Sequence, residues 1–170
     1  MRSDDLPPTE GRGRYIIRGR RATYSLPLNR RLEIRFVENN RDVDTYLYLR
    51  NRVNWKVLSR EQAQKALDNS LYILTAYEGD TPVGMGRIVG DGAVICYVQD
   101  LIIVPDHQRN GTGSKILRRL TEYVDSLRLP DTEMMYALMC AKGREKFYDK
   151  HQFIARPTET LGPGMIRYLK

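Results

Sequence analysis

The chain has 170 residues, of which 41% are hydrophobic and 29% are charged, and its net charge is +7. This length fits one domain with a sizeable core and leaves little room for a second. No apolar run is long enough to span a membrane, and the N-terminus lacks the apolar stretch of a secretory signal. We therefore expect a soluble, cytoplasmic protein with no membrane partner.

Residues 1–31 form an arginine-rich arm with little periodic apolar pattern. Eight arginines outweigh three acidic residues there, so the arm has a net charge of +5 and the remaining residues have only +2. Three interpretations remain open: a leader, an extra strand or hairpin docked on the domain or on a neighbour, and a nucleic-acid-binding arm. Because no nucleic-acid motif accompanies the arginines, nucleic acid is not expected as a partner. The folded domain is expected to span residues 32–170.

Strand-like and helix-like patterns follow one another along this domain. In chain order, the pattern predicts a strand at 32–37, helices at 43–55 and 60–67, strands at 71–77, 82–89 and 93–104, a helix at 112–127, a strand at 135–140, a helix at 144–151, and strands at 153–155 and 165–169. Asn39 and Asn40 are capping candidates for the first helix, and Ser59 for the second. Tight turns imply an antiparallel meander, and the longest helix should return the chain parallel to the strand before it.

The most informative segment is a glycine-rich turn, Gln108 to Gly113, between an apolar strand and a helix. Such a turn leaves unpaired backbone N–H groups that favour an anion. Gly111 and Gly113 would let a diphosphate approach the backbone, while Arg109 and Lys115 could neutralise it. The spacing fits neither a P-loop nor a dinucleotide-binding fingerprint. The sequence therefore predicts another kind of phosphate-bearing ligand.

Three segments together resemble one known family. The turn follows a strand that ends at Val104 and matches Gln/Arg-x-x-Gly-x-Gly/Ala, which resembles the acetyl-CoA signature of the GNAT family of N-acetyltransferases. Phe147 to Phe153 resembles the family's second signature, Phe-Tyr-x-x-x-Gly-Phe, with Gln152 in place of the glycine. Gly84 to Gly92 resembles the hairpin that precedes the cofactor strand. The resemblance covers roughly residues 32–170.

This resemblance implies a fold and a cosubstrate. The expected fold is α/β of the GNAT type: a mixed, mostly antiparallel sheet of about six to seven strands with a splayed central pair, flanked by helices. Acetyl-CoA is the implied cosubstrate, and no metal is expected. The splayed strand should bind the pantetheine arm and the turn the pyrophosphate. Carried over by motif, the cofactor contacts are Ile102, Ile103, Val104, Gln108, Arg109, Asn110, Gly111, Thr112, Gly113 and Ser114.

Acetyl transfer to an alkyl amine needs a proton acceptor, a polarised carbonyl and a proton donor for the departing thiolate. The resemblance assigns Tyr148 as the general acid; the alternative is a tyrosine that packs beside Phe147. Asp100 is the candidate base, because a carboxylate inside an apolar run needs a purpose or a partner. The alternative is a structural aspartate bonded to Arg87, and Tyr97 is the second candidate for the base.

We expect an acetyl-CoA-dependent N-acetyltransferase that transfers acetyl to a primary amine of a small molecule by direct attack in a ternary complex. Cys96 and Cys140 lie in apolar runs and are expected in the core, which argues against an acetyl-enzyme. Two alternatives stay open: a protein or peptide N-acetyltransferase, and a catalytically inert CoA-binding module with a nucleic-acid-binding arm. The sequence identifies neither the amine nor the oligomeric state, and a homodimer is compatible with it.

Overall fold

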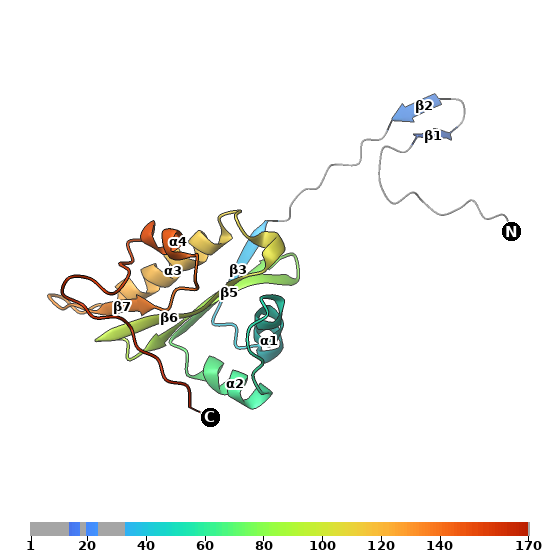
Figure 1. Cartoon of the computed structure of the whole chain (residues 1–170). Coiled ribbons are helices and arrows are strands. Elements are labelled where there is room, and N and C mark those ends of the chain that lie inside the picture. Colours follow the sequence, from blue (N-terminus) through green and yellow to red (C-terminus); the bar gives the residue numbers. More distant parts are fainter. Residues whose placement is uncertain (1–13, 18–19, 24–32, 170) are drawn as a thin grey trace. The chain divides into compact units, whose positions relative to one another are not determined.

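The computed structural model of the chain describes residues 14–17, 20–23 and 33–169. The chain divides into two units, Met1–Glu33 and Ile34–Lys170. In the first unit, β1 (Arg14–Ile17) and β2 (Arg20–Thr23) pair antiparallel (Figure 1). The arm thus contains a hairpin, and its other residues lie outside the described part of the chain.

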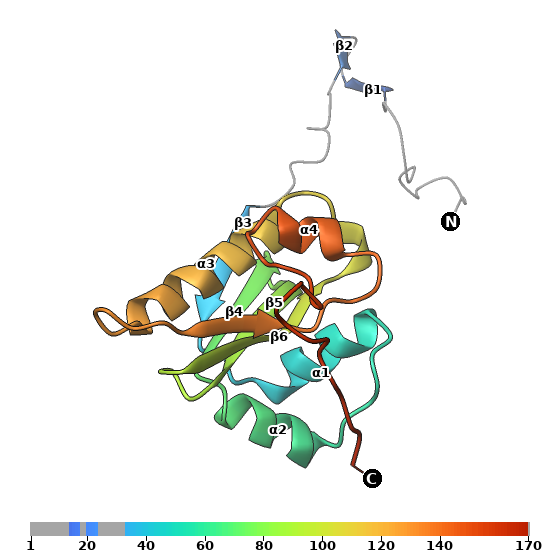
Figure 2. The ribbon, with the colours of Figure 1, turned by 60° about the vertical axis from the view of Figure 1, so that its left-hand side comes forward.

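The second unit is built on a five-stranded sheet in the order β3-β4-β5-β6-β7. The strands are β3 (Ile34–Glu38), β4 (Tyr72–Glu78), β5 (Thr81–Gly90), β6 (Ile95–Ile103) and β7 (Met135–Leu138). The helices are α1 (Val43–Arg52), α2 (Arg60–Asp68), the 3-10 turn η1 (Pro105–His107), α3 (Thr112–Leu127) and α4 (Glu145–Asp149). Helix α3 covers one face of the sheet, and α1 and α2 cover the other (Figures 1 and 2).

The core lies between the sheet and these helices. Ile116, Leu117 and Leu120 of α3 are completely buried, as are Leu49 of α1 and Leu67 of α2. Each helix therefore contributes one apolar stripe to a sheet that is covered on both faces, and this burial is the main source of stability.

Two helix starts show how local chemistry fixes the elements. Ser59 caps α2 as predicted, because its side chain accepts a hydrogen bond from the N–H of Gln62. For α1 the prediction of Asn39 or Asn40 was wrong: Asp42 directly precedes the helix, has an extended backbone and accepts from Thr45. The side chain of Asn39 instead accepts from a backbone N–H of β4.

The predicted order of elements is confirmed up to α4. Strands β3 to β6 are antiparallel neighbours, and β7 returns parallel to β6 after α3. The prediction of two further strands, at 153–155 and 165–169, was wrong, because no strand follows β7 between Met139 and Leu169. Ile154 and Met165 to Leu169 stay largely exposed, so these two runs lack the buried face that a strand packs against a core. The sheet of this unit therefore has five strands, and the C-terminal segment descends past β6 without pairing (Figures 1 and 2).

A β-bulge interrupts the pairing of β5 with β6. Arg87 lies opposite Gln99 and Met85 lies opposite Ile102, so Asp100 and one further residue of β6 face the single residue Gly86. Asp100 has a left-handed backbone with φ 55°, which a bulge commonly requires and which aspartate tolerates. A Cβ at Gly86 would lie 2.7 Å from Leu120 of α3, so the close approach of α3 needs glycine here.

Strands β6 and β7 separate just before the bulge. Their pairing runs only from Ile95 opposite Met135 to Val98 opposite Leu138. The second half of β6, from Gln99 to Ile103, therefore has one free edge, as expected for the splayed pair. Backbone polar groups along this edge are available to a ligand that lies beside the strand as a further strand would.

Candidate active site

A cavity of about 570 Å³ lies along the free edge of β6. Four parts of the chain line it: the end of β6 with the start of η1, the end of α1 with the loop after it, the glycine turn, and the segment before α4 with α4 itself. Their lining residues are Leu101, Ile102, Ile103 and Pro105; Arg52, Val53, Asn54 and Trp55; Gln108, Arg109, Gly111, Gly113 and Ser114; and Ala141, Arg144, Phe147 and Tyr148. The cavity thus joins the splayed strand to both segments that carry the family-like motifs.

The glycine turn has the geometry of an anion site. Gly111, the N-cap of α3, has φ 87°, and Arg109 has φ 62°. Asn110 accepts from the N–H of Thr112 at 3.1 Å. In the described part of the chain, no acceptor faces the N–H groups of Gly113 and Ser114 at the start of this 16-residue helix. Unpaired N–H groups at a helix N-terminus bind phosphate or carboxylate oxygens.

Gly113 also leaves room for the ligand. A Cβ added there would meet Ile103 at 3.5 Å and Phe147 at 3.7 Å, which are ordinary contacts, so the fold itself tolerates a small side chain. Because Gly113 lines the cavity, a larger side chain would grow into the space beside the turn. Packing alone therefore does not require glycine at position 113, whereas Gly111 is needed for its left-handed backbone.

Most of the predicted cofactor contacts line this cavity. Those that do are Ile102, Ile103, Gln108, Arg109, Gly111, Gly113 and Ser114. Val104, Asn110 and Thr112 do not. Val104 is buried and donates its N–H to Val83, Thr112 is buried, and the side chain of Asn110 caps the helix start. These three residues support the shape of the turn.

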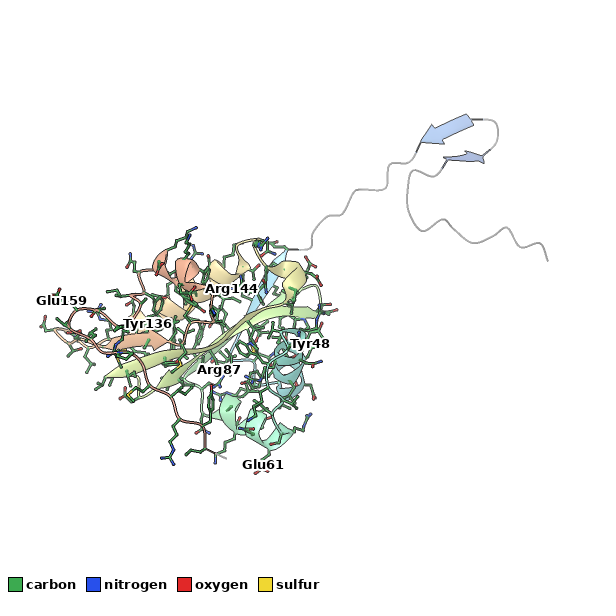
Figure 3. All side chains as sticks on the ribbon, in the orientation of Figure 1. Tyr48, Glu61, Arg87, Tyr136, Arg144 and Glu159 are labelled. Atoms are coloured by element: carbon green, nitrogen blue, oxygen red, sulfur yellow. The ribbon has the colours of Figure 1, made fainter. Side chains whose placement is uncertain are left out.

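Gln108 connects the turn to the strand and to the opposite wall. Its side-chain nitrogen donates to the carbonyl of Ile103 at 2.9 Å, and its side-chain oxygen accepts from Arg144 at 3.3 Å. The sequence analysis did not single out Arg144, although it lies only three residues before the second signature. Figure 3 labels Arg144 on the α3 side of the sheet and Arg87 on the side of α1 and α2.

Tyr148 lines the cavity from α4. Its ring makes edge-to-face contacts with Phe147 at 5.0 Å and with Phe153 at 5.9 Å between centroids. Burial raises the pKa of Tyr148 to about 12, with a further contribution from Cys140 and an opposing one from Arg144. The hydroxyl therefore keeps its proton at neutral pH, which is the state that a proton donor needs.

Asp100 does not line the cavity and lies in a buried cluster on the side of the sheet that α1 and α2 cover. Its carboxylate accepts from Arg87 Nε at 2.7 Å, from the hydroxyl of Tyr46 at 2.6 Å and from Arg50 Nη1 at 2.9 Å. The side chain of Asp100 is completely buried. This geometry favours the structural interpretation, in which Asp100 is bonded to Arg87, over a free general base.

The two arginines of this cluster extend it to both helices. Arg87 also donates to the carbonyl of Ala66 and to the hydroxyl of Ser70, and Arg50 donates to the carbonyl of Lys56. Burial and the neighbouring Asp100 raise the pKa of Tyr46, which therefore stays a neutral phenol. One carboxylate thus faces two guanidinium groups, and the cluster has an excess of one positive charge. Arg50 could not be predicted as a partner of Asp100 from a local motif, because it lies 50 residues away in α1.

The end of α1 and the loop after it form the second wall, and their Arg52 and Asn54 were not predicted as site residues, because they lie in none of the family-like motifs. Trp55 lines the cavity beside them and is 37% exposed. None of the lining residues is an aspartate, glutamate, histidine or cysteine. Cys96 is buried as expected, but the same prediction for Cys140 was wrong, because Cys140 is exposed at the end of the sheet, where β7 has already stopped.

Residues 14–17, 20–23 and 33–169 contain neither a metal-binding cluster nor a helix that could span a membrane. No group of three histidine, cysteine or acidic side chains in these ranges is close enough together to hold a metal ion. No helix there is sufficiently long and apolar to cross a membrane.

The family follows from comparison with known proteins. The acetyltransferase (GNAT) domain family matches residues 69–155, which include the bulge, the glycine turn and Tyr148. This match covers just over half of the chain, and the chain belongs to the GNAT family. It is accordingly an N-acetyltransferase of the family that uses acetyl-CoA. Among curated proteins no sequence matches the chain.

Solved structures agree with this assignment. A probable acetyltransferase of unknown function from meticillin-resistant Staphylococcus aureus is 28% identical, with a TM-score of 0.70 over 80% of this chain and 100% of that one. A GNAT family acetyltransferase from Streptococcus pneumoniae is also 28% identical, with a TM-score of 0.69 over 81% of this chain and 99% of that one. Glucosamine-6-phosphate N-acetyltransferase from Arabidopsis thaliana, at 13% identity, a TM-score of 0.59 and coverage of 81% and 98%, shares the fold.

Proposed function

We propose that the protein transfers the acetyl group of acetyl-CoA to the primary amine of a small molecule, by direct attack in a ternary complex. The proposal depends on one observation: the free edge of β6, the unpaired N–H groups of the glycine turn and the hydroxyl of Tyr148 all meet in one cavity. The walls from the loop after α1 and from the segment before α4 favour a small acceptor over an extended peptide.

The residues present fit acetyl-CoA. The N–H groups of Gly113 and Ser114, together with Arg109 and Arg144, would hold the diphosphate, and the free edge of β6 would hold the pantetheine arm. Bound in this way, acetyl-CoA supplies an activated thioester. Neither cysteine lines the cavity, which supports direct attack over an acetyl-enzyme.

Tyr148 is the proposed proton donor. As the nitrogen–carbon bond forms and the carbon–sulfur bond breaks, the sulfur takes the proton of Tyr148, and the tyrosine recovers a proton from the new amide nitrogen. The same apolar surroundings that raise the pKa of Tyr148 also disfavour a bare thiolate, so proton donation stabilises the departing sulfur.

The remaining proton, which the ammonium form of the acceptor must lose first, goes to solvent in our proposal. No carboxylate or imidazole lines the cavity, and burial raises the pKa of Tyr97, the second candidate base. We therefore propose that Asp100 positions the bulge of β6 through Arg50 and Arg87 and does not act as the base. Positive surroundings lower the pKa of a bound amine and favour its free base.

A thiol-release assay with acetyl-CoA and a panel of small amines tests the proposed function. Mass spectrometry of the products should find one acetyl group on the nitrogen of the acceptor for each thiol released. Acetylated protein or peptide with no acetylated small amine would favour the peptide alternative. Thermal stabilisation by CoA without transfer to any acceptor would favour an inert CoA-binding module.

A further inference from the structure

The cavity walls carry positive charge with no acidic counterpart among the lining residues. Their charged residues are Arg52, Arg109 and Arg144. Arg109 belongs to the glycine turn and Arg144 donates to Gln108 of that turn, so the diphosphate accounts for both. Arg52 is the remaining lining cation, and it lies in the wall that also contains Trp55.

Little in the structure offsets the charge of Arg52. Its guanidinium donates to the hydroxyl of Tyr48 at 3.0 Å and to the carboxylate of Asp106 at 3.1 Å. The side chain of Asp106 is 77% exposed, and an ion pair so open to water is screened and weak. The side chain of Arg52 is itself 38% exposed, and its guanidinium can exchange this partner for a ligand anion.

A second source of positive charge lies behind the same wall. The guanidinium of Arg50 lies 5.3 Å from the ring of Trp55, which lines the cavity. Arg50 and Arg87 share the single carboxylate of Asp100, and the buried Nε of Arg50 has no hydrogen-bond partner in the described part of the chain. Because buried charge is poorly screened, this excess acts on the adjacent cavity more strongly than a surface charge would.

From these charges we infer that the acceptor is an amine that also carries an anionic group, either a carboxylate or a phosphate. The inference rests on the proposed function and narrows its substrate class. Arginine suits both anions, because its planar fork donates two parallel hydrogen bonds. A polyamine or another polycation would meet only like charge at this wall, which costs binding energy and gives discrimination.

Matched acceptors test the inference. β-Alanine is compared with its neutral amide, β-alaninamide, and O-phosphoethanolamine with 2-methoxyethylamine; spermidine represents polycations. In the thiol-release assay, the anionic member of at least one pair should have a kcat/KM about tenfold or more above its neutral partner, and salt should reduce this ratio. The pair that responds identifies carboxylate or phosphate. A readout independent of turnover is the additional thermal stabilisation that the same acceptor gives to the CoA-bound protein.

Two outcomes distinguish a failure of the anionic-acceptor inference from a failure of the proposed N-acetyltransferase function. Equal or faster acetylation of the neutral amines or of spermidine overturns the anionic acceptor and leaves the N-acetyltransferase proposal intact. No acetylation of any of the five amines by a protein that binds CoA, together with no added stabilisation, overturns both.

Substitution of Arg52 tests whether this residue recognises the anionic group of the acceptor. Arg52→Gln should reduce the preference for the anionic acceptor about tenfold with little change for the neutral one, and Arg52→Lys should restore part of it. Arg60→Gln is the matched control, because Arg60 is 64% exposed on α2, pairs with Asp44 and does not line the cavity. An equal loss in Arg52→Gln and Arg60→Gln would show an effect of net charge alone and overturn the role of Arg52.

Discussion

One face of strand β6 and the free edge of the same strand use polar groups in opposite ways. On the side of α1 and α2, the carboxylate of Asp100 is completely buried and accepts hydrogen bonds from Arg50, Arg87 and Tyr46. At the free edge, the strand runs beside the N–H groups of Gly113 and Ser114 that have no acceptor in the described part of the chain. Polar groups that are satisfied within the fold support it, and those left unsatisfied at a cavity await a ligand.

The largest expected effect is a loss of stability when the buried cluster around Asp100 is disrupted. Asp100→Asn removes the only carboxylate shared by Arg50 and Arg87, so two buried guanidinium groups lose their counter-charge. We expect a loss of about 3 to 5 kcal/mol in the free energy of unfolding, measured by urea denaturation. Asp131→Asn is the matched control, because Asp131 is exposed and has a similar left-handed backbone, with φ 58°.

The pH dependence of the Asp100→Asn protein sharpens the same test. If Asp100 only positions the bulge, any remaining activity should keep the acidic limb of kcat/KM, and this limb should shift with the pKa of the acceptor amine. A stable Asp100→Asn protein whose acidic limb is flat would instead return Asp100 to the role of general base.

Substitution of a residue that lines the cavity should reduce catalysis and leave the fold intact. Tyr148→Phe should reduce kcat by about 10² to 10⁴, the usual range for a positioned proton donor, with nearly unchanged CoA binding. Because the pKa of Tyr148 is raised to about 12, the wild-type rate should show no loss from this residue as the pH rises to 10, the ordinary tyrosine value. Tyr168→Phe, at an 80% exposed position, is the control. Wild-type turnover in Tyr148→Phe would contradict the assignment.

The anion site at the turn can be closed by one substitution. Gly113→Asp places a carboxylate among the N–H groups that would hold the diphosphate. CoA at about a hundred times its Kd should stabilise the wild type by roughly 2.7 kcal/mol, and this stabilisation should disappear in the variant. Gly164→Asp, where an added Cβ meets nothing within 4 Å, should respond to CoA like the wild type. A normal response of Gly113→Asp would exclude the turn as the diphosphate site.

The smallest effect is expected from the arginine-rich arm. Deletion of residues 1–28 should leave CoA binding and acetyl transfer unchanged, because every motif of the site lies after residue 83. Calorimetry with CoA and the thiol-release assay measure the two properties separately. A truncated protein that folds and binds CoA but no longer transfers acetyl would show that the arm contributes to the acceptor site.

Local sequence patterns predicted the glycine turn and helix α3 beside the free edge of β6, but they predicted the cluster around Asp100 only in part. Helix α3 begins at Thr112 and ends at Leu127, as predicted, because the glycine turn and the apolar spacing define it within a short stretch of sequence. Of the partners of Asp100, the sequence suggested Arg87 but not Arg50 or Tyr46, because these two lie in α1, 50 and 54 residues away along the chain, and only the tertiary fold brings them to β6. The last two predicted strands failed because apolar residues alone do not supply a pairing partner.

The bulge at Asp100 also has a consequence for folding. A slip of β6 by one residue against β5 would turn the carboxylate toward the opposite face, where Ile116 and Leu120 of α3 pack over Gly86. The aspartate would then be buried among hydrocarbon without a donor, and both arginines would lose their anion. The cluster therefore strongly disfavours the neighbouring alignments of the two strands, and a single acidic residue helps to fix the register of β6 against β5.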